Sequence, residues 1–414
     1  MTRSTRRTTW AALTLSALAF PILGSSCPGN GPGPGPGLGK VAIITNIGLT
    51  KDGLVSAGNG IIAFGDDSGG VSYIDVGSTT VNEIPGTFRP DAVFCAGRKV
   101  ILVADGATNS ISVHDTTTGN TVNVPDTDVF DINPGSFLEH QWMDVDGNLC
   151  AILHRGLVNT ELKLIDVSGV TPAVTTYTTT LVAPHNVDLD AENGRIVVME
   201  DNELVTIFDV SLPANQTPTT FDIQGDAGIP VSFFPNTLIG SEKVLFPTTD
   251  AAVKLLDVGD GTLDDLVGPS ANGGTTHFEI RAGLYVYFLN RSGQGDFDGT
   301  NGYRILIGDT VDPTVFELGT GVDLGAGILE GFGHSSAIDP LGETVYLAGR
   351  FGQSSGGGVN EPTALQCFNI TDGWDVFTDS NGDPVYAADV SASSSVVAFK
   401  VEDGAGAVLG YYVP

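Results

Sequence analysis

The chain has 414 residues and a formal net charge of −31, which excludes nucleic acid and anionic membrane surfaces as partners because both repel an acidic protein. It contains 55 glycines and 22 prolines, and no long stretch has apolar residues at helical spacing. This composition excludes a helical fold and favours an all-β protein with many turns.

Residues 1–26 have the features of a secretory signal peptide. Arg3, Arg6 and Arg7 precede an apolar run over residues 10–23, which is too short to span a bilayer with ease. The small residues 24–26 follow, as they do before a cleavage site. We therefore expect the mature chain to lie outside the cytoplasm.

The five residues ending at Cys27 read LGSSC, which resembles the lipobox of bacterial lipoproteins. This resemblance implies that Cys27 is lipidated and becomes the new N-terminus. Residues 27–39 are mostly glycine and proline and form a tether with no side chains to bury. The prediction is a cell-envelope lipoprotein, periplasmic or at the cell surface, that contacts the membrane only through its anchor. The alternative is a secreted protein cleaved after Ser26.

Residues 185–223 contain one complete repeat unit. Alternating and apolar segments predict strands at 186–190, 196–199, 204–210 and 219–223, with a turn at 192–194. Such a four-stranded sheet is stable only when further copies pack beside it, so we looked for them along the chain.

Eight copies of the second strand recur at intervals of 39 to 59 residues, beginning at Ile61, Val100, Cys150, Ile196, Leu245, Val286, Val345 and Val396. A third strand also recurs, and in five copies its fourth residue is an aspartate, as in KLIDV at 163–167 and TIFDV at 206–210. Four-stranded units at roughly 40 to 50 residues are typical of a β-propeller.

The last copy is one strand short, and the segment at 41–46 has no partner near it in the sequence. We predict that this N-terminal strand pairs with the last blade and closes the ring, which leaves no open edge. The domain at 40–414 then forms a monomeric, all-β propeller of eight four-stranded blades. Seven blades are the alternative if one copy is not a blade.

Polar residues recur where each innermost strand begins and each second strand ends, and both places lie on the same face of a propeller. They are the histidines His140, His185, His277 and His334, the arginines Arg155, Arg291 and Arg350, and the aspartates Asp66, Asp105, Asp201 and Asp250. Three hypotheses follow. The imidazoles bind copper or zinc, or the arginines clamp an anionic or lactone-like molecule beside a histidine acid or base, or these residues only cap strands.

The segments APHNVDLD at 183–190, GHSSAIDPLGETVYLAGR at 333–350 and YVYFLNRSGQGDFDG at 285–299 resemble repeats of the bacterial YVTN and lactonase-like propellers. Members of that group include lactonases, cell-surface proteins and metal-bearing oxidoreductases. The resemblance implies a propeller fold and an extracytoplasmic location. No catalytic residues of that group can be matched to positions in this sequence.

The acidic loop GDFDGTNG at 295–302 offers oxygen ligands at short spacing from Asp296, Asp298 and Asn301. Calcium favours such loops, and an ordinary polar turn is the alternative. Cys95, Cys150 and Cys367 fall in different repeats, so we expect buried thiols and no disulfide framework.

These features favour an exported, lipid-anchored propeller that binds a small molecule or a protein as a scaffold at the cell envelope. The competing hypothesis is an enzyme, a lactone hydrolase or metal-dependent oxidoreductase, that uses the polar face. The sequence does not identify the ligand or a catalytic residue.

Overall fold

The computed structural model describes the chain in segments, all of which are strands, turns or irregular connections. The described residues are 42–49, 55–65, 70–86, 90–104, 111–124, 143–155, 160–182, 184–200, 204–223, 237–239, 243–247, 253–267, 274–281, 284–290, 304–308, 313–317, 335–338, 344–348, 350–351, 361–369, 373–376, 385–393, 395–403 and 406–413. Within these segments no helix is long and apolar enough to cross a membrane.

The first half of the described chain forms four antiparallel sheets of four strands each. In chain order their strands are β2 (Val55–Ala57), β3 (Ile61–Gly65), β4 (Val71–Asp75), β5 (Asn82–Glu83); β6 (Pro90–Ala96), β7 (Lys99–Ala104), β8 (Ile111–Asp115), β9 (Asn120–Val124); β10 (Met143–Asp146), β11 (Leu149–Arg155), β12 (Thr160–Asp166), β13 (Ala173–Thr176); and β14 (Pro184–Asp190), β15 (Arg195–Glu200), β16 (Leu204–Asp209), β17 (Thr219–Asp222).

The second half continues with three four-stranded sheets and one of six strands, in the described residues. Their strands are β18 (Thr237–Ile239), β19 (Lys243–Pro247), β20 (Val253–Asp257), β21 (Leu263–Val267); β22 (Gly274–Arg281), β23 (Leu284–Asn290), β24 (Arg304–Gly308), β25 (Pro313–Glu317); β26 (Ser335–Ile338), β27 (Thr344–Ala348), β30 (Gln366–Asn369), β31 (Gly373–Val376); and β1 (Ala42–Leu49), β34 (Gly406–Tyr412), β33 (Val397–Asp403), β32 (Tyr386–Ala392), β29 (Glu361–Ala364), β28 (Arg350–Phe351).

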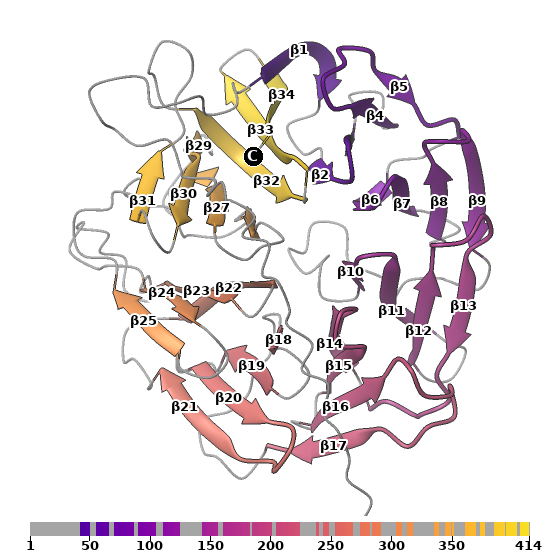
Figure 1. Cartoon of the computed structure of the whole chain (residues 1–414), viewed down its shortest axis with the longest axis vertical. Helices are drawn as coiled ribbons and strands as arrows, with labels where there is room; N and C mark the ends of the chain where they lie inside the picture. The colour runs from indigo at the N-terminus through magenta and orange to yellow at the C-terminus, as the bar shows by residue number, and fades with distance from the viewer. Residues whose placement is uncertain are drawn as a thin grey trace, which may run out of the picture.

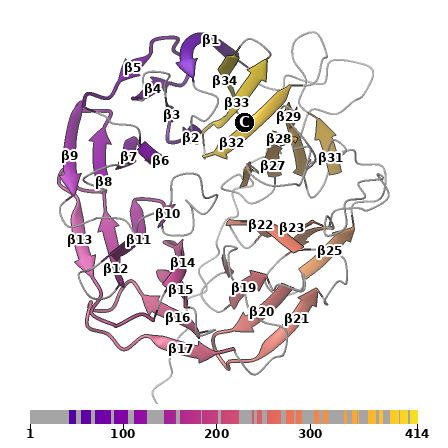
Figure 2. The ribbon, with the colours of Figure 1, turned by 180° about the vertical axis from the view of Figure 1, so that it is seen from behind.

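The sheets are set around a common centre, with β2, β6, β10, β14, β18, β22 and β32 nearest to it and β5, β9, β13, β17, β21, β25 and β31 at the rim (Figure 1, and from behind in Figure 2). Each innermost strand contacts the innermost strand of the next sheet in the chain, and β32 contacts β2. This radial arrangement of four-stranded antiparallel sheets is that of a β-propeller. The predicted all-β propeller fold is therefore confirmed at this level.

The core lies between neighbouring sheets, because the central strands of a sheet bury side chains on both of its faces. On β15, Ile196 and Val198 pack against Leu153 and Leu162 of the preceding sheet. Val197, on the opposite face of the same strand, packs against Val244 and Leu256 of the following sheet. Side chains alternate between faces along a strand, so a strand buried on both sides is apolar throughout. Each fully buried aliphatic side chain contributes about 1.5–3 kcal/mol.

The repeat unit matches its prediction closely. The predicted strands at 186–190, 196–199, 204–210 and 219–223 correspond to β14, β15, β16 and β17. The predicted turn lies between Asp190 and Arg195, and Gly194 has a φ of 66°, a left-handed conformation that a glycine adopts without strain.

The two ends of the described chain meet in one sheet. β1 pairs antiparallel with β34, with Ala42 opposite Tyr411 and Ile44 opposite Leu409. On the other side of β34 lies β33, where Phe399 is fully buried. A Cβ atom at Gly410 would lie 2.1 Å from Phe399 Cε2, so β34 needs a glycine where this ring crosses it.

An insertion that was not predicted from the sequence joins two neighbouring sheets. Between β27 and β30 the chain forms β28 and β29, and β29 pairs with the first residues of β32 through Thr363 and Ala364. One residue later the same run of chain enters β30 and pairs with β27. Leu365, at the point of the switch, is fully buried and donates its N–H to Val385 O at 2.7 Å. One stretch of chain therefore belongs to two sheets.

Side chains also tie successive innermost strands together. Ser391 Oγ on β32 accepts from the N–H of Ala57 on β2 at 3.0 Å. Ser56 Oγ on β2 accepts from the N–H of Cys95 on β6 at 2.8 Å. Asp144 Oδ2 on β10 accepts from the N–H of Leu189 on β14 at 2.7 Å. Each bond satisfies a backbone donor that has no strand partner on the inner side of its sheet.

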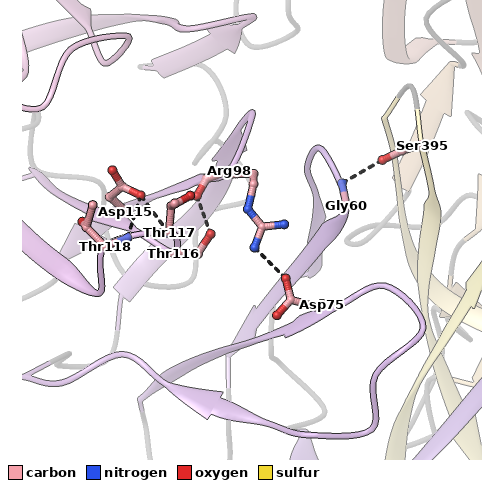
Figure 3. A network of polar contacts seen from close by, with 8 residues as sticks. All are labelled: Gly60, Asp75, Arg98, Asp115, Thr116, Thr117, Thr118 and Ser395. Carbon is pink, nitrogen blue, oxygen red and sulfur yellow. Dashed lines mark hydrogen bonds and ion pairs between the residues drawn. The ribbon is translucent and has the colours of Figure 1, made fainter.

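Polar contacts continue around the turns between the first two strands of neighbouring sheets (Figure 3). Arg98, in the β6–β7 turn, donates to Asp75 at the end of β4 at 2.6 Å. Ser395 Oγ, before β33, accepts from the N–H of Gly60 at 2.9 Å. Both partners of the Arg98–Asp75 pair are exposed, with 41% and 49% of their side-chain surface accessible, so this ion pair adds little stability.

Candidate functional site

The two ends of each sheet are named according to the direction of its innermost strand. The entry end is where the innermost strand begins, and the turn end holds the hairpin to the second strand. Turn ends of neighbouring sheets touch, since the N–H of Asn59 donates to Gly97 O at 2.8 Å and Asp146 Oδ2 accepts from the N–H of Ala191 at 2.8 Å. The entry ends therefore lie together on the opposite face of the molecule.

Four of the predicted site residues fall on described strands. His185 and His277 lie near the entry ends of β14 and β22, Arg155 is the last residue of β11, and Arg350 is the first residue of the inserted strand β28. The other candidates lie outside the described residues. These are Cys27, Asp66, Asp105, His140, Asp201, Asp250, Arg291, Asp296, Asp298, Asn301 and His334.

A β-bulge interrupts the entry end of four innermost strands. In β14, Pro184 pairs with Glu200 and Asn186 with Met199, so His185 is the extra residue. Equivalent shifts occur in β6, β22 and β32, where the extra residues are Asp91, Thr276 and Ala388. A bulge leaves its extra residue outside the ladder and changes its direction, and bulges are frequent beside active sites.

The bulged strands alternate with shorter ones along the chain. The bulged strands have seven or eight residues, whereas β2, β10, β18 and β26 have three or four. The registers of these short strands, over their described residues, contain no shift. The residues immediately before these short strands lie outside the described part of the chain.

Glu200 lies directly opposite the bulge that carries His185. It is the last residue of β15 and the Cα partner of Pro184, and only 5% of its surface is exposed. Glu200 Oε2 accepts from the N–H of Val182 at 2.5 Å, and Oε1 accepts from the hydroxyl of Thr206 at 2.6 Å. A buried carboxylate is tolerated only when such bonds replace its hydration. No motif or repeat in the sequence marked Glu200 as a site residue.

Three further ionisable side chains are buried on second and third strands of the sheets. His154 on β11, Lys163 on β12 and Lys400 on β33 have 8%, 5% and 4% of their surface exposed. Lys163 Nζ lies 3.8 Å from Glu161 Oε2. Charged groups are rarely buried to this extent without partners.

The turn ends carry the aspartates that end the third strands. In four sheets this carboxylate accepts from the backbone N–H two residues later, at 2.8–2.9 Å, and the residues are Asp115, Asp166, Asp209 and Asp257. Hydrogen bonds from Ser211 and the nearby Arg195 hold the pKa of Asp209 below its usual value. These aspartates stabilise turns, which accounts for part of the acidic composition.

The described residues contain no group of three His, Cys, Asp or Glu side chains placed to hold a metal ion. Cys95 and Cys150 are both free thiols. Burial raises the pKa of Cys95 to about 12 and raises that of Cys150 as well, so both are protonated at neutral pH. This agrees with the prediction of structural thiols at these two positions, while the side chain of Cys367 lies outside the described residues.

The sequence matches no family model and no curated protein. Among solved structures, the chain is similar to the Cps50 (Swd1) beta-propeller domain of Myceliophteria thermophila at 12% identity, with a TM-score of 0.45 over 91% of this chain and 100% of that one. It is similar to Raptor of Chaetomium thermophilum at 11% identity, with a TM-score of 0.41 over 77% of this chain and 27% of that one. It also spans 36% of the tricorn protease at 12% identity, with a TM-score of 0.36 over 84% of this chain.

His114 lies away from the entry ends, near the turn end of β8. It is 2% exposed, its Nδ1 lies 2.9 Å from Thr121 Oγ1, and its ring is tilted against that of Tyr73 at 5.7 Å between centroids. In the described part of the chain its Nε2 has no hydrogen-bond partner. Burial lowers the pKa of His114, and nearby Asp115 partly offsets this effect.

This pKa shift predicts a loss of stability in acid. An unfolded histidine titrates near pH 6.5, so below that value the unfolded state binds a proton that folded His114 does not. The contribution of neutral His114 to the free energy of unfolding is therefore fully present above about pH 6.5. It is lost as the pH falls toward the lowered pKa. In His114→Phe, which keeps the ring but cannot titrate, we expect the melting temperature to fall less than that of the wild type between pH 7 and pH 5.

The matched control is Thr121→Val, which removes the Nδ1 partner and retains the histidine. We expect it to cost about 1 kcal/mol at all pH values and to keep the wild-type pH dependence. If the melting temperatures of the wild type and His114→Phe fall equally between pH 7 and pH 5, His114 does not titrate as described.

Proposed function

We propose that the chain is a binding module, an eight-bladed propeller whose ligand binds at the entry ends of the sheets. Two observations support the eight-bladed, closed ring. β1 supplies the strand that the last sheet lacks, through its pairing with β34, and β32 contacts β2. A ring closed in this way is rigid and holds residues from distant parts of the sequence on one face.

The recurrence of bulges at the entry ends is the observation that carries the proposal. A bulge weakens its ladder, so four of them at equivalent places indicate selection for something other than stability. One bulge carries His185, and the residue before it, Pro184, is the Cα partner of the buried Glu200. The turn ends, by contrast, use their polar groups to cap turns and join sheets.

Two ligand classes suit the residues that the sequence predicts for the entry side. A small molecule with a carboxylate or a lactone carbonyl fits the guanidinium groups of Arg155, Arg291 and Arg350. A divalent cation fits the imidazoles and the acidic loop at 295–302. Hydrolysis of the lactone, or redox chemistry at a bound metal, would make the module an enzyme.

Purified full-length protein provides the test. Its metal content is measured directly, and its melting temperature is recorded with Ca²⁺, Zn²⁺, Cu²⁺, citrate and γ-butyrolactone, with lactone hydrolysis followed in parallel. We expect one of these probes to raise the melting temperature of the wild type. We expect a smaller rise in His185→Ala and in His334→Ala, whose melting temperatures without the probe stay near that of the wild type.

The control is His114→Phe, which removes a histidine near a turn end and should keep the full response. If His185→Ala and His334→Ala only lower the melting temperature and leave every response unchanged, these histidines are structural and the proposal is wrong. Turnover of the lactone that both variants abolish would identify an enzyme instead.

We also propose that the chain is exported and held at the cell envelope by lipid on Cys27. The support is the order of the N-terminal features, with a basic start, an apolar run, small residues before the cysteine and a Gly/Pro tether after it. In a bacterial host we expect the wild type in the membrane fraction and Cys27→Ser in the soluble extracytoplasmic fraction. Equal membrane association of the two proteins would contradict the lipid anchor.

A further inference from the structure

Glu200 holds the chain at two points just before the bulge that carries His185. Its backbone pairs with Pro184, immediately before the bulged residue. Its carboxylate accepts from the N–H of Val182, in the connection that leads into β14. Val182 and Pro184 are therefore both held by Glu200, one by its side chain and the other by its backbone.

The second carboxylate oxygen is fixed from the opposite direction. Thr206 on β16 donates its hydroxyl to Glu200 Oε1 at 2.6 Å, and Thr206 Oγ1 lies 3.3 Å from Thr220 Oγ1 on β17. A row of polar groups thus crosses three strands and ends at the entry segment. A buried, fully bonded carboxylate in such a row has little freedom to move.

The other bulged sheets show that a bulge does not require an acid at this position. The residues that pair immediately before the bulges are Ala104 in the β6 sheet, Leu289 in the β22 sheet and Val401 in the β32 sheet. All three are apolar and their bulges form. Glu200 is therefore not needed for the bulge itself, and an apolar residue would avoid the cost of burying a carboxylate.

We propose that Glu200 is a positioning residue that sets the conformation and accessibility of His185 at the entry end of β14. The carboxylate acts through the N–H of Val182 and does not contact the ligand. This inference deepens the proposed function, because it rests on His185 as the residue that meets the ligand. It concerns the conformation of the free protein and is tested without a ligand.

The experiment uses full-length protein and two readouts confined to this segment. Hydrogen exchange followed by mass spectrometry reports the amide of Val182, and diethyl pyrocarbonate labelling with peptide mapping reports the reactivity of His185. Labelling is carried out at pH 8, where an ordinary imidazole is neutral, so the rate reports access and conformation rather than titration. The variants are Glu200→Ala, Glu200→Gln and Thr220→Val.

In Glu200→Ala we expect both rates to change by about tenfold or more, the factor that corresponds to the loss of a hydrogen bond to a charged group. Glu200→Gln retains an oxygen that accepts from Val182 and an amide that donates to Thr206, so its rates should stay within about twofold of wild type. Thr220→Val, at the far end of the polar row, should behave like the wild type. Rescue by glutamine separates positioning from loss of packing.

Unchanged rates in a folded Glu200→Ala protein would overturn the proposal. So would a Glu200→Gln protein that changes as much as Glu200→Ala. If Glu200→Ala does not fold, Glu200→Leu replaces it, because a leucine occupies the equivalent position in the β22 sheet. That variant also lacks the bond to Val182, so a change of about tenfold in the reactivity of His185 supports the proposal and wild-type reactivity contradicts it. A failure of the ligand experiments with His185→Ala would leave these rates unaffected, so the two proposals fail independently.

Discussion

Packing between neighbouring sheets is the interaction on which the whole molecule depends. A four-stranded sheet exposes two faces, and here both faces of the central strands are apolar, so no sheet is stable without a neighbour on each side. Val197 and Val198 show this directly, because adjacent residues of one strand belong to two different cores. The first and last sheets have the same requirement. In this region β1 pairs with β34 of the last sheet. The β29–β30 run also joins the last sheet to the sheet before it.

The two ends of the sheets differ in how their polar side chains are used. At the turn ends, polar side chains satisfy backbone groups, as Asp209 does for its turn and Asp146 for the next sheet. At the entry ends the ladders are interrupted, and a carboxylate that would be costly to bury alone is bonded on both oxygens. Irregular backbone supported by a rigid scaffold is the usual arrangement of a binding site. The proposed binding site at the entry ends rests on this arrangement.

The sequence predicted those features that arise within one sheet. Alternating and continuous apolar runs located the strands of the 185–223 repeat, and Gly194 marked its turn, because these signals act between residues close in the chain. The recurring third-strand aspartate was visible in the sequence, but its role in capping the turn became clear only from the bonded N–H groups. The placement of His185 and His277 near the starts of innermost strands followed from the repeat, whereas their surroundings did not.

Other features depend on partners distant in the sequence, and they could not be predicted. Ser391 Oγ accepts from the N–H of Ala57 across the contact between the last and first sheets. The sequence around either residue does not indicate this bond. The bulges are shifts of one residue in the pairing of two strands, which the composition of either strand does not reveal. Glu200 occupies a position where three related sheets have apolar residues, so only its bonds to Val182 and Thr206 distinguish it.

Hydrogen exchange in β34 tests the central claim most directly, because this strand depends on β1 for its outer partner. The comparison is between the full-length protein and a variant in which residues 42–49 are replaced by a flexible linker of equal length. If closure between the first and last strands holds the ring together, the β34 amides are as protected in the intact protein as those of β15. They should lose that protection in the variant, together with a lower melting temperature. Equal protection of β34 in both proteins would contradict the closed ring.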